Sequence, residues 1–516
     1  MHVLFVFLNN DSPVGFSHGL AVMSAELKEA GHRVSLLHVN EQLGLPPDRG
    51  RLRRTFRRRR PDVVALSFGT NHAAVAAQIA AWAREALPDA HIVAGGVDPT
   101  LRPAEVLSWP AIDLVARGEL DGYRFVKVVD DLERGRRPLR RPGIWLRRGR
   151  QVVQNPLGPP VDLTVPGPLV DYGLFDQRRI LRLKRGWADI ITGRGCPHRC
   201  SYCFNRSLRR CYRDDGGAGA PAARYVRKRP VADVIAELDC FAARYRDELQ
   251  MFSFVDDVFP IQRRWLRQFF DAYTGRFDTP LVFLARPGQV DEELAQRARA
   301  AGTYMVRLGV ESGSERVRRE VLLRRESNRA IQRAVGTLHR AGVNAFAYLM
   351  LGIPTESMAE LWSTFRLAAR VKLDALRFSL CWPYPGTALH DHCRDTGLLQ
   401  TGLEIFQGNY LTRSPLRWPR QRARFLQRIP RFYDVALNRY LDLRRAKAYA
   451  AVLEALRRCP DPEWSDGAAA CERERADQLI GEALAAGDQA FVAPFPDRPD
   501  ILLRQGIARS QPLVMG

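Results

Sequence analysis

The stretch GRGCPHRCSYCFN at residues 193–205 decides how the rest of this chain is interpreted. It follows the apolar segment ADIIT (188–192), and its cysteines, Cys196, Cys200 and Cys203, have the spacing C-x3-C-x2-C. Three thiolates on one short loop can hold three irons of a [4Fe–4S] cluster and leave the fourth iron without a protein ligand. An open coordination position is typical of a catalytic metal, because a substrate can bind there.

A zinc site and unligated thiols remain the alternatives for these three cysteines. Zinc prefers four ligands, and His198, inside the loop, is poorly placed to close on the same ion. The chain has nine cysteines, an odd number, and the six outside the loop show no paired spacing. This favours a metal or cluster site over disulfides.

Downstream of the cysteine loop, short apolar segments alternate with helix-period stretches. Six strand–helix units predict a partial parallel (β/α)6 barrel over residues 181–395, with its chemistry on the loops at the carboxyl ends of the strands. The expected strands are residues 188–192, 251–257, 281–286, 303–310, 344–351 and 375–380.

The first 135 residues show an earlier alternation of the same kind. Short β-branched strands separated by helices predict a doubly wound, Rossmann-like domain, whose ligands bind at the carboxyl ends of the strands. No GxGxxG follows the first strand, so a dinucleotide is not favoured. The expected strands are residues 2–8, 33–39, 62–68, 91–96 and 111–118, and the clearest helices are residues 19–31 and 73–87.

The remaining segments have a different character. Residues 136–180 are rich in proline, glycine and arginine, and predict a linker with a hairpin that turns at Arg148-Gly149. Residues 396–516 read as helical and carry no recognisable motif. The fold class expected is therefore α/β, with a helical C-terminal region.

Composition limits the function classes. A chain of 516 residues with 46% hydrophobic and 26% charged residues is typical of a globular protein of several domains. No apolar stretch is long enough for a membrane span and no signal peptide is seen, so we expect a cytoplasmic protein. The net charge is +22, but the basic residues are spread along the chain. The densest run, Arg51–Arg60, is expected to be an exposed helix face rather than a nucleic-acid site.

The cysteine motif resembles the signature of the radical S-adenosylmethionine (SAM) enzymes. Further segments follow in the order expected of the subgroup with an N-terminal cobalamin-binding domain. The resemblance covers roughly residues 1–395 and implies a [4Fe–4S] cluster, SAM and cobalamin as cofactors. The segments are FVDDVF (254–259), RLGVESGSERV (307–317), LMLGIPTES (349–357) and PYPGTALHD (383–391).

The resemblance also implies roles for single residues. Carboxylates suit an ammonium group or a sugar hydroxyl, and glycine lets the backbone approach a ring closely. A helix cap, an ion pair and a plain turn remain the simpler roles for such residues. The implied cluster ligands are Cys196, Cys200 and Cys203, the adenine contacts Tyr202, Phe204, Gly352 and Pro354, the contacts to the SAM amine Asp256 and Asp257, and the ribose or methionine contacts Glu311 and Ser312.

Cobalamin is expected at the strand ends of the first domain. The motif D-x-H-x-x-G, whose histidine binds cobalt, is absent: around His18, Phe16 stands in place of the aspartate and Ala21 in place of the glycine. We expect His18 to begin a helix, and a scaffold domain without cofactor remains the alternative. The expected contacts are Asn10, Ser12, Gly69, Gly95 and Gly96.

The function implied by the resemblance is that of a cobalamin-dependent radical SAM enzyme. Its most direct form is a C-methyltransferase that generates a 5′-deoxyadenosyl radical and methylates an unactivated carbon of a small-molecule or natural-product substrate. A reducing electron donor of the flavodoxin or ferredoxin type is the implied partner. A non-methylating rearrangement, cyclisation or oxidation remains open, as do a non-catalytic sensor and RNA modification. No cysteine precedes Cys196 to hold the second cluster of the RNA methylthiotransferases.

Overall fold

The computed structural model describes residues 1–215, 225–400, 413–459, 466–492 and 501–504. Its N-terminal part is built on one sheet with the strand order β2-β1-β3-β4-β5-β6-β7, in which the first five strands run parallel. This confirms the doubly wound domain. The parallel strands are β1 (His2–Leu8), β2 (Arg33–Val39), β3 (Val63–Ser67), β4 (His91–Gly95) and β5 (Leu114–Ala116).

Helices cover both faces of this first sheet. Alternate residues of β1 separate the two faces: Val3 and Phe5 belong to one apolar core, and Leu4 and Val6 to the other. Because both faces are buried, the strand is apolar throughout instead of alternating. The helices of the first core are α1 (His18–Glu29) and α6 (Arg124–Glu133), and those of the second are α2 (Arg49–Arg59), α3 (Ala73–Ala86) and α5 (Pro103–Ser108).

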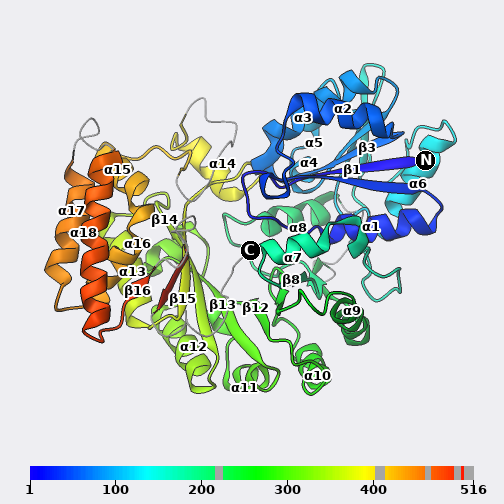
Figure 1. Ribbon diagram of the computed structural model, residues 1–516. Helices are drawn as coiled ribbons and strands as arrows, with labels where there is room; N and C mark the ends of the chain where they lie inside the picture. Colours follow the sequence, from blue (N-terminus) through cyan, green and yellow to red (C-terminus); the bar gives the residue numbers. More distant parts are fainter. Residues whose placement is uncertain (216–224, 401–412, 460–465, 493–500, 505–516) are drawn as a thin grey trace.

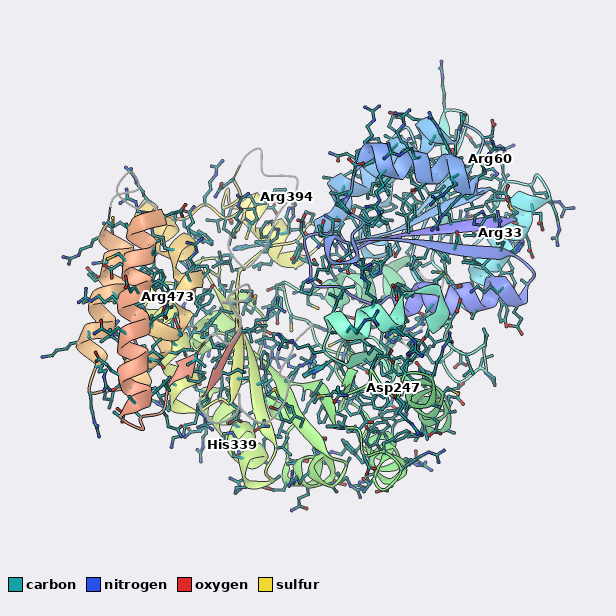
Figure 2. The ribbon with its side chains drawn as sticks, in the orientation of Figure 1. Arg33, Arg60, Asp247, His339, Arg394 and Arg473 are labelled. Atoms are coloured by element: carbon teal, nitrogen blue, oxygen red, sulfur yellow. The ribbon has the colours of Figure 1, made fainter. Side chains whose placement is uncertain are left out.

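The arginine-rich run forms α2, as expected. Only Leu52 and Phe56 of this helix are buried, one turn apart, and most of its arginines are exposed, while Arg53 and Arg59 are half-buried. Exposed basic side chains also occur elsewhere, for example Arg33 on β2 and Arg394 near the barrel (Figure 2). The positive charge is thus distributed over the molecule.

The predicted hairpin is present and has a second role. Strands β6 (Ile144–Arg148) and β7 (Gln151–Gln154) pair antiparallel with each other. Strand β6 also pairs antiparallel with β5, so that the hairpin extends the first sheet. The sequence pattern predicts the turn, but it carries no information about which distant strand the hairpin joins.

The second sheet contains the predicted partial barrel, and Figure 1 shows it between the N-terminal domain and the C-terminal helices. Its strand order is β16-β17-β15-β14-β13-β12-β11-β8, and the last six strands of this order are parallel to one another. These are β8 (Trp187–Ile190), β11 (Met251–Phe254), β12 (Leu281–Ala285), β13 (Thr303–Glu311), β14 (Asn344–Leu351) and β15 (Ala375–Leu380).

Helices connect successive barrel strands and pack on the outside of the sheet. Residues such as Phe254, Phe269 and Leu338 form one continuous apolar core there. The principal helices are α9 (Val231–Arg244), α10 (Arg263–Tyr273), α11 (Glu292–Ala300), α12 (Asn328–Arg340) and α13 (Met358–Arg370). Helix α8 (Phe204–Asp215) instead contacts α4 (Val97–Leu101) of the N-terminal domain.

The C-terminal region is mostly helical, as predicted, and two short strands are added to it. Strands β16 (Phe491–Val492) and β17 (Ile501–Arg504) pair antiparallel, and β17 also pairs with β15 at the barrel edge. In the described part of the chain, no helix has the length and apolarity needed to cross a membrane. The helices are α15 (Arg420–Arg428), α16 (Tyr433–Leu441), α17 (Ala446–Arg458) and α18 (Asp466–Ala485), and α14 (Ala388–Asp395) directly precedes the region.

Candidate functional site

The three motif cysteines lie on the loop between the short strand β9 (Gly193–Arg194) and α8, at the mouth of the barrel. Cys196 and Cys200 are buried and Cys203 is half-buried. The carboxylate of Asp257 holds the loop from both sides: it accepts hydrogen bonds from the backbone N–H of Gly195 (3.1 Å) and from Asn205 Nδ2 (2.6 Å). The cysteines are therefore presented on an ordered loop.

The surroundings of the thiols fit a positively charged metal centre. Burial raises the pKa of Cys196 to about 12 and that of Cys203 to about 11, and the neighbouring thiols add to both shifts. The guanidinium nitrogens Nη1 of Arg286 and Arg324 lie 3.8 and 4.0 Å from Cys200 Sγ. Thiolates in such a site need a cation to compensate their charge, and ligation of a cluster by these three cysteines stays a prediction.

The arrangement does not suit a single zinc ion. Four ligands at about 2.3 Å would bring the sulfur atoms close together around one point. Within the described residues, the group whose ligand atoms all converge within 4.8 Å is His32, Asp130 and Glu133, and the cysteines are not part of it.

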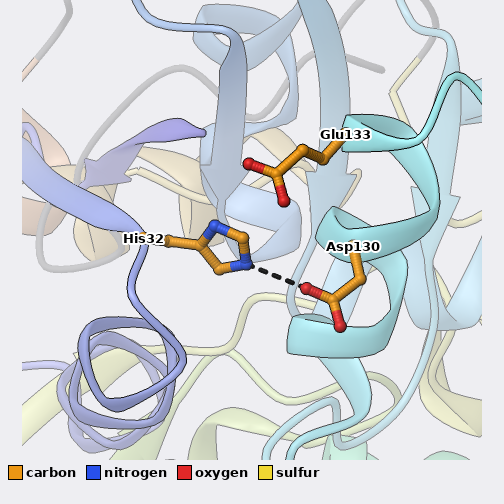
Figure 3. A group of neighbouring side chains, drawn as sticks. All are labelled: His32, Asp130 and Glu133. Carbon is orange, nitrogen blue, oxygen red and sulfur yellow. Dashed lines mark hydrogen bonds and ion pairs between the residues drawn. The ribbon is translucent and has the colours of Figure 1, made fainter.

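The group of His32, Asp130 and Glu133 lies where β2 begins and α6 ends, and Figure 3 shows the His32 ring turned towards both carboxylates. His32 Nε2 is 3.1 Å from Asp130 Oδ1. The amino group of Met1 lies 3.1 Å from His32 Nδ1 and 2.9 Å from Glu133 Oε1. These side chains already surround a positive charge, so we assign no metal to them.

The residues predicted at the end of the second barrel strand are both engaged within the protein. Asp256 is buried and accepts hydrogen bonds from Thr192 Oγ1 (2.7 Å) and from Lys228 Nζ (3.1 Å), the latter on β10 (Arg227–Lys228). Asp257 supports the cysteine loop, as described above. The observed contacts of both aspartates are thus structural, and their contact with the SAM amine stays a prediction.

Glu311 ends β13 in a strained backbone conformation, with a φ of 70°. Its Oε1 accepts a hydrogen bond from Tyr202 Oη (2.8 Å), and Arg324 Nη1 lies 3.0 Å from the same hydroxyl and 3.4 Å from the carboxylate. Burial raises the pKa of Glu311, and Arg324 opposes this shift. A strained residue inside a buried polar network is typical of a functional site. Ser312, the next residue, is fully buried near Thr364.

The predicted adenine contacts lie on further loops at the barrel mouth. Gly352 follows β14 with a φ of +74°, and a Cβ atom there would lie 2.6 Å from the ring of Trp418. Trp418 Nε1 also donates a hydrogen bond to the Gly352 carbonyl (3.1 Å). Pro354 is buried in the same turn, and Phe204 begins α8 with its ring 5.4 Å from that of Tyr384. The C-terminal region therefore supports this turn, which no motif indicated.

A cavity of about 640 Å³ joins the two domains. Gly95 and Gly96 line it from the first sheet, and Gly193, Asp256 and Asp257 line it from the barrel beside the cysteine loop. Linker residues between 161 and 170 form a further wall. Of the remaining predicted cobalamin contacts, Asn10, Ser12 and Gly69 are not among the residues that line it.

Ion pairs fix the two domains around this cavity. Arg194, on β9, binds Asp121 with an Nη1–Oδ1 distance of 3.0 Å, and Arg227 binds Glu119 with an Nη2–Oε1 distance of 2.6 Å. Both carboxylates belong to the loop that follows β5, and both arginines flank the cysteine motif in the barrel. The end of the first sheet is thereby held against the cysteine loop.

One face of α1 presents polar groups to the cavity. His18, Val22 and Glu26 are spaced four residues apart and all line it. His18 Nε2 and Glu26 Oε2 are buried, and neither has a hydrogen-bond partner among the residues that the structure describes. Buried polar atoms are normally satisfied, so these two fit a ligand with polar substituents, such as the amide-bearing cobalamin. His18 is also the first residue of α1, as predicted.

Glu26 makes stability depend on pH. Burial raises its pKa from 4.5 to about 7, and the backbone N–H of Gly122 partly opposes this. The folded protein therefore binds this proton more tightly than the unfolded chain, so the stabilisation is full below pH 4.5 and is lost as the pH rises towards about 7. Ionisation of Glu26 lowers the free energy of unfolding as the pH rises. We expect Glu26→Gln to remove this decrease, which is on the order of 1–2 kcal/mol.

The measurement is thermal melting of the cofactor-free protein between pH 5 and 8. The variant should melt above the wild type at pH 8, and the difference should shrink or reverse at pH 5. Parallel melting curves for the two proteins over this range would contradict the assignment of a raised pKa to Glu26.

Comparisons with known proteins agree with this architecture. The model of the radical SAM superfamily matches residues 190–368, and that of the B12 binding domain matches residues 9–123. An uncharacterized methyltransferase of Pyrococcus horikoshii is 25% identical over 343 residues, which is 66% of this chain and 71% of that protein. An anaerobic magnesium-protoporphyrin IX monomethyl ester cyclase of Cereibacter sphaeroides is 24% identical over 393 residues, 73% of this chain and 60% of that protein.

A solved structure shares the fold. The radical SAM methyltransferase TsrM from Kitasatospora setae, bound to tryptophan and a SAM analogue, superposes with a TM-score of 0.62 at 18% identity, covering 81% of this chain and 80% of TsrM. A doubly wound domain, a partial barrel and a three-cysteine loop beside their common cavity together define an α/β enzyme with a metal centre. The chain belongs to the radical SAM enzymes that carry a cobalamin-binding domain.

Proposed function

We propose that this protein is a cobalamin-dependent radical SAM methyltransferase that acts on an unactivated carbon of a small molecule. The observation that carries this proposal is the cavity of about 640 Å³, which lies between the strand ends of the B12 binding domain and the barrel, where Gly193 and Arg194 line it immediately before the cysteine loop. One chamber can thus accommodate a methyl donor and a radical generator. TsrM, a methyltransferase with tryptophan as its substrate, has the same fold.

The cofactors supply the difficult chemistry: when bound, the cluster provides the electron that cleaves SAM to a 5′-deoxyadenosyl radical, and cobalamin provides the methyl group. The protein binds and orients them. Cys196, Cys200 and Cys203 ligate the cluster, and the network of Tyr202 and Glu311 lies beside it to orient SAM.

The division of labour follows the domains. Residues 1–135 bind cobalamin, residues 136–180 link the domains, and residues 181–395 bind the cluster and SAM. The C-terminal region, residues 396–516, contributes β17 to the edge of the barrel sheet. Linker side chains Val165 and Leu169 line the cavity and are 65% and 62% exposed, so a bound corrin would cover apolar surface there. We also propose that the protein is cytoplasmic and that a flavodoxin or ferredoxin donates the electron that reduces its cluster.

A second function is favoured by one relative. The Cereibacter sphaeroides protein, 24% identical to this chain, is named as a cyclase. A cyclisation would use the same radical and would leave no new methyl group on the product.

The test is anaerobic reconstitution of the full chain with iron, sulfide and hydroxocobalamin, followed by desalting and metal analysis. We expect about four irons and about one cobalt per chain, and transfer of a deuterated methyl group from labelled SAM to the bound cobalamin. Iron with cobalt but without methyl transfer would favour the cyclase. The absence of iron would contradict radical chemistry altogether.

A further inference from the structure

We propose that Arg307 and Arg377, inside the barrel, bind an anionic group of the substrate, a carboxylate or a phosphoryl group. This inference rests on the proposed function, because the barrel interior is a substrate site only if the barrel carries out the reaction. It narrows the substrate class to small organic anions.

The strand register places both arginines in one polar layer of the barrel interior. Side chains two residues apart on a strand point to the same face. The interior residues nearest the amino ends form an apolar floor of Trp187, Met251, Val282, Met305, Phe346 and Ala375, closed by Ile501 and Leu503 of β17. Two residues further along the same six strands come Asp189, Ser253, Leu284, Arg307, Tyr348 and Arg377.

A smaller cavity of about 170 Å³ lies at this layer. Asp189, Ser253, Arg307 and Arg377 line it from the barrel, and residues 13–15 of the first domain line it from the opposite side. The covering loop is held in place, since Val14 N–H donates to Gln42 Oε1 (2.8 Å). The pocket is thus built by both domains.

The charged side chains that line this pocket are mostly basic. Lys184, Arg307 and Arg377 are the cations, and Asp189 is the sole carboxylate among the lining residues. Lys184 forms an ion pair with Asp189, which uses that carboxylate. The pocket therefore offers no second carboxylate to Arg307, and an anion would compensate its charge.

Arg307 is a buried guanidinium group whose charge is not paired within the described residues. It is 7% exposed, its guanidinium lies 5.1 Å from the centre of the Trp187 ring, and Nη1 donates to Ser253 Oγ at 3.4 Å. Its Nε is buried without a hydrogen-bond partner, and no carboxylate of the described residues forms an ion pair with it. A buried charge is costly unless it is paired, and a guanidinium pairs best with carboxylate or phosphoryl oxygens.

The pocket also faces the reaction centre. Val255 lines both this pocket and the large cavity, which Gly193 and Arg194 line immediately before the cysteine loop. On β13, Arg307 precedes Glu311 by four residues, which corresponds to about 13 Å along the strand. A substrate held here by its anionic end would extend towards the cluster, with its reacting carbon roughly 10 Å from that end.

The test measures anion binding by the full, cluster-reconstituted protein. Thermal stability is followed while inorganic phosphate or propionate replaces chloride at constant ionic strength. We expect a saturable rise in Tm for the wild type, and binding weakened between about 10- and 100-fold in Arg307→Gln, with partial retention in Arg307→Lys. The matched control is Arg333→Gln, which removes an exposed arginine of α12 and should behave as the wild type.

Each outcome has one meaning. Binding of phosphate alone indicates a phosphoryl substrate, and binding of propionate alone indicates a carboxylate. Equal binding by Arg307→Gln and the wild type, or no saturable binding by the wild type, overturns the inference and leaves Arg307 as a core residue stacked on Trp187. If Arg307→Gln does not fold, Arg377→Gln takes its place. Formation of 5′-deoxyadenosine is assayed separately, so a failure of the proposed function is distinguished from a failure of the anion site.

Discussion

Replacing Cys200 with alanine is expected to abolish formation of 5′-deoxyadenosine from SAM in the presence of a strong reductant. Cys200 is buried, and two guanidinium groups lie at 3.8 and 4.0 Å from its sulfur, so its removal takes away one of the three thiol ligands proposed for the cluster. Loss of a group that only supports a metal ligand already costs about 10- to 100-fold. Loss of the ligand itself should cost at least ~100-fold.

The matched control for this experiment is Cys240→Ala. Cys240 is an exposed cysteine of α9 and lies outside the motif, so its removal should leave both the iron content and the product unchanged. Product formation is measured by chromatography, and iron by metal analysis of the same sample. If Cys200→Ala still cleaved SAM at the wild-type rate, the three-cysteine loop would not be the cluster site.

Filling the large cavity from α1 is expected to remove cobalamin and to spare the cluster. Val22 lies between His18 and Glu26 on the face of α1 that lines the cavity. A tryptophan at this position would occupy space that the corrin needs, and overpacking of this kind costs about 1–3 kcal/mol. We therefore expect Val22→Trp to bind cobalamin roughly 10- to 100-fold more weakly.

The readout is cobalt and iron per chain after reconstitution and desalting, with the visible spectrum of the bound corrin. Val152→Trp, which places the same side chain on an exposed position of β7, should retain both metals. Unchanged cobalt in Val22→Trp would mean that cobalamin binds elsewhere. It would leave the cavity as a substrate chamber and would favour the cyclase over the methyltransferase.

The ion pairs between the two domains explain why the Cys200→Ala and Val22→Trp experiments address one reaction. Asp121 and Glu119, at the end of the first sheet, bind Arg194 and Arg227 on either side of the cysteine motif. Hydrogen-bonded ion pairs that are largely shielded from solvent fix the relative orientation of the two domains, in addition to any contribution to stability. A ligand in the first domain is thereby kept at a defined distance from the cysteine loop.

Local pattern was sufficient for the elements of the fold and for the metal motif. All six parallel barrel strands overlap predicted apolar runs, because their outer faces pack in the apolar core and many of their inner residues are apolar as well. The motif at Cys196, Cys200 and Cys203 is similarly local, since three ligands on one loop need no distant partner. The hairpin turn at Arg148-Gly149 follows from local turn chemistry as well.

Contacts between distant segments were decided by the tertiary structure alone. The pairing of β17 with β15, the support of Gly352 by Trp418 and the approach of Arg286 and Arg324 to Cys200 join residues far apart in the chain. The same is true of the arginine layer in the barrel. Periodicity states which face of an element is buried, but the partner across the core depends on how whole elements pack, and that is a property of the folded chain.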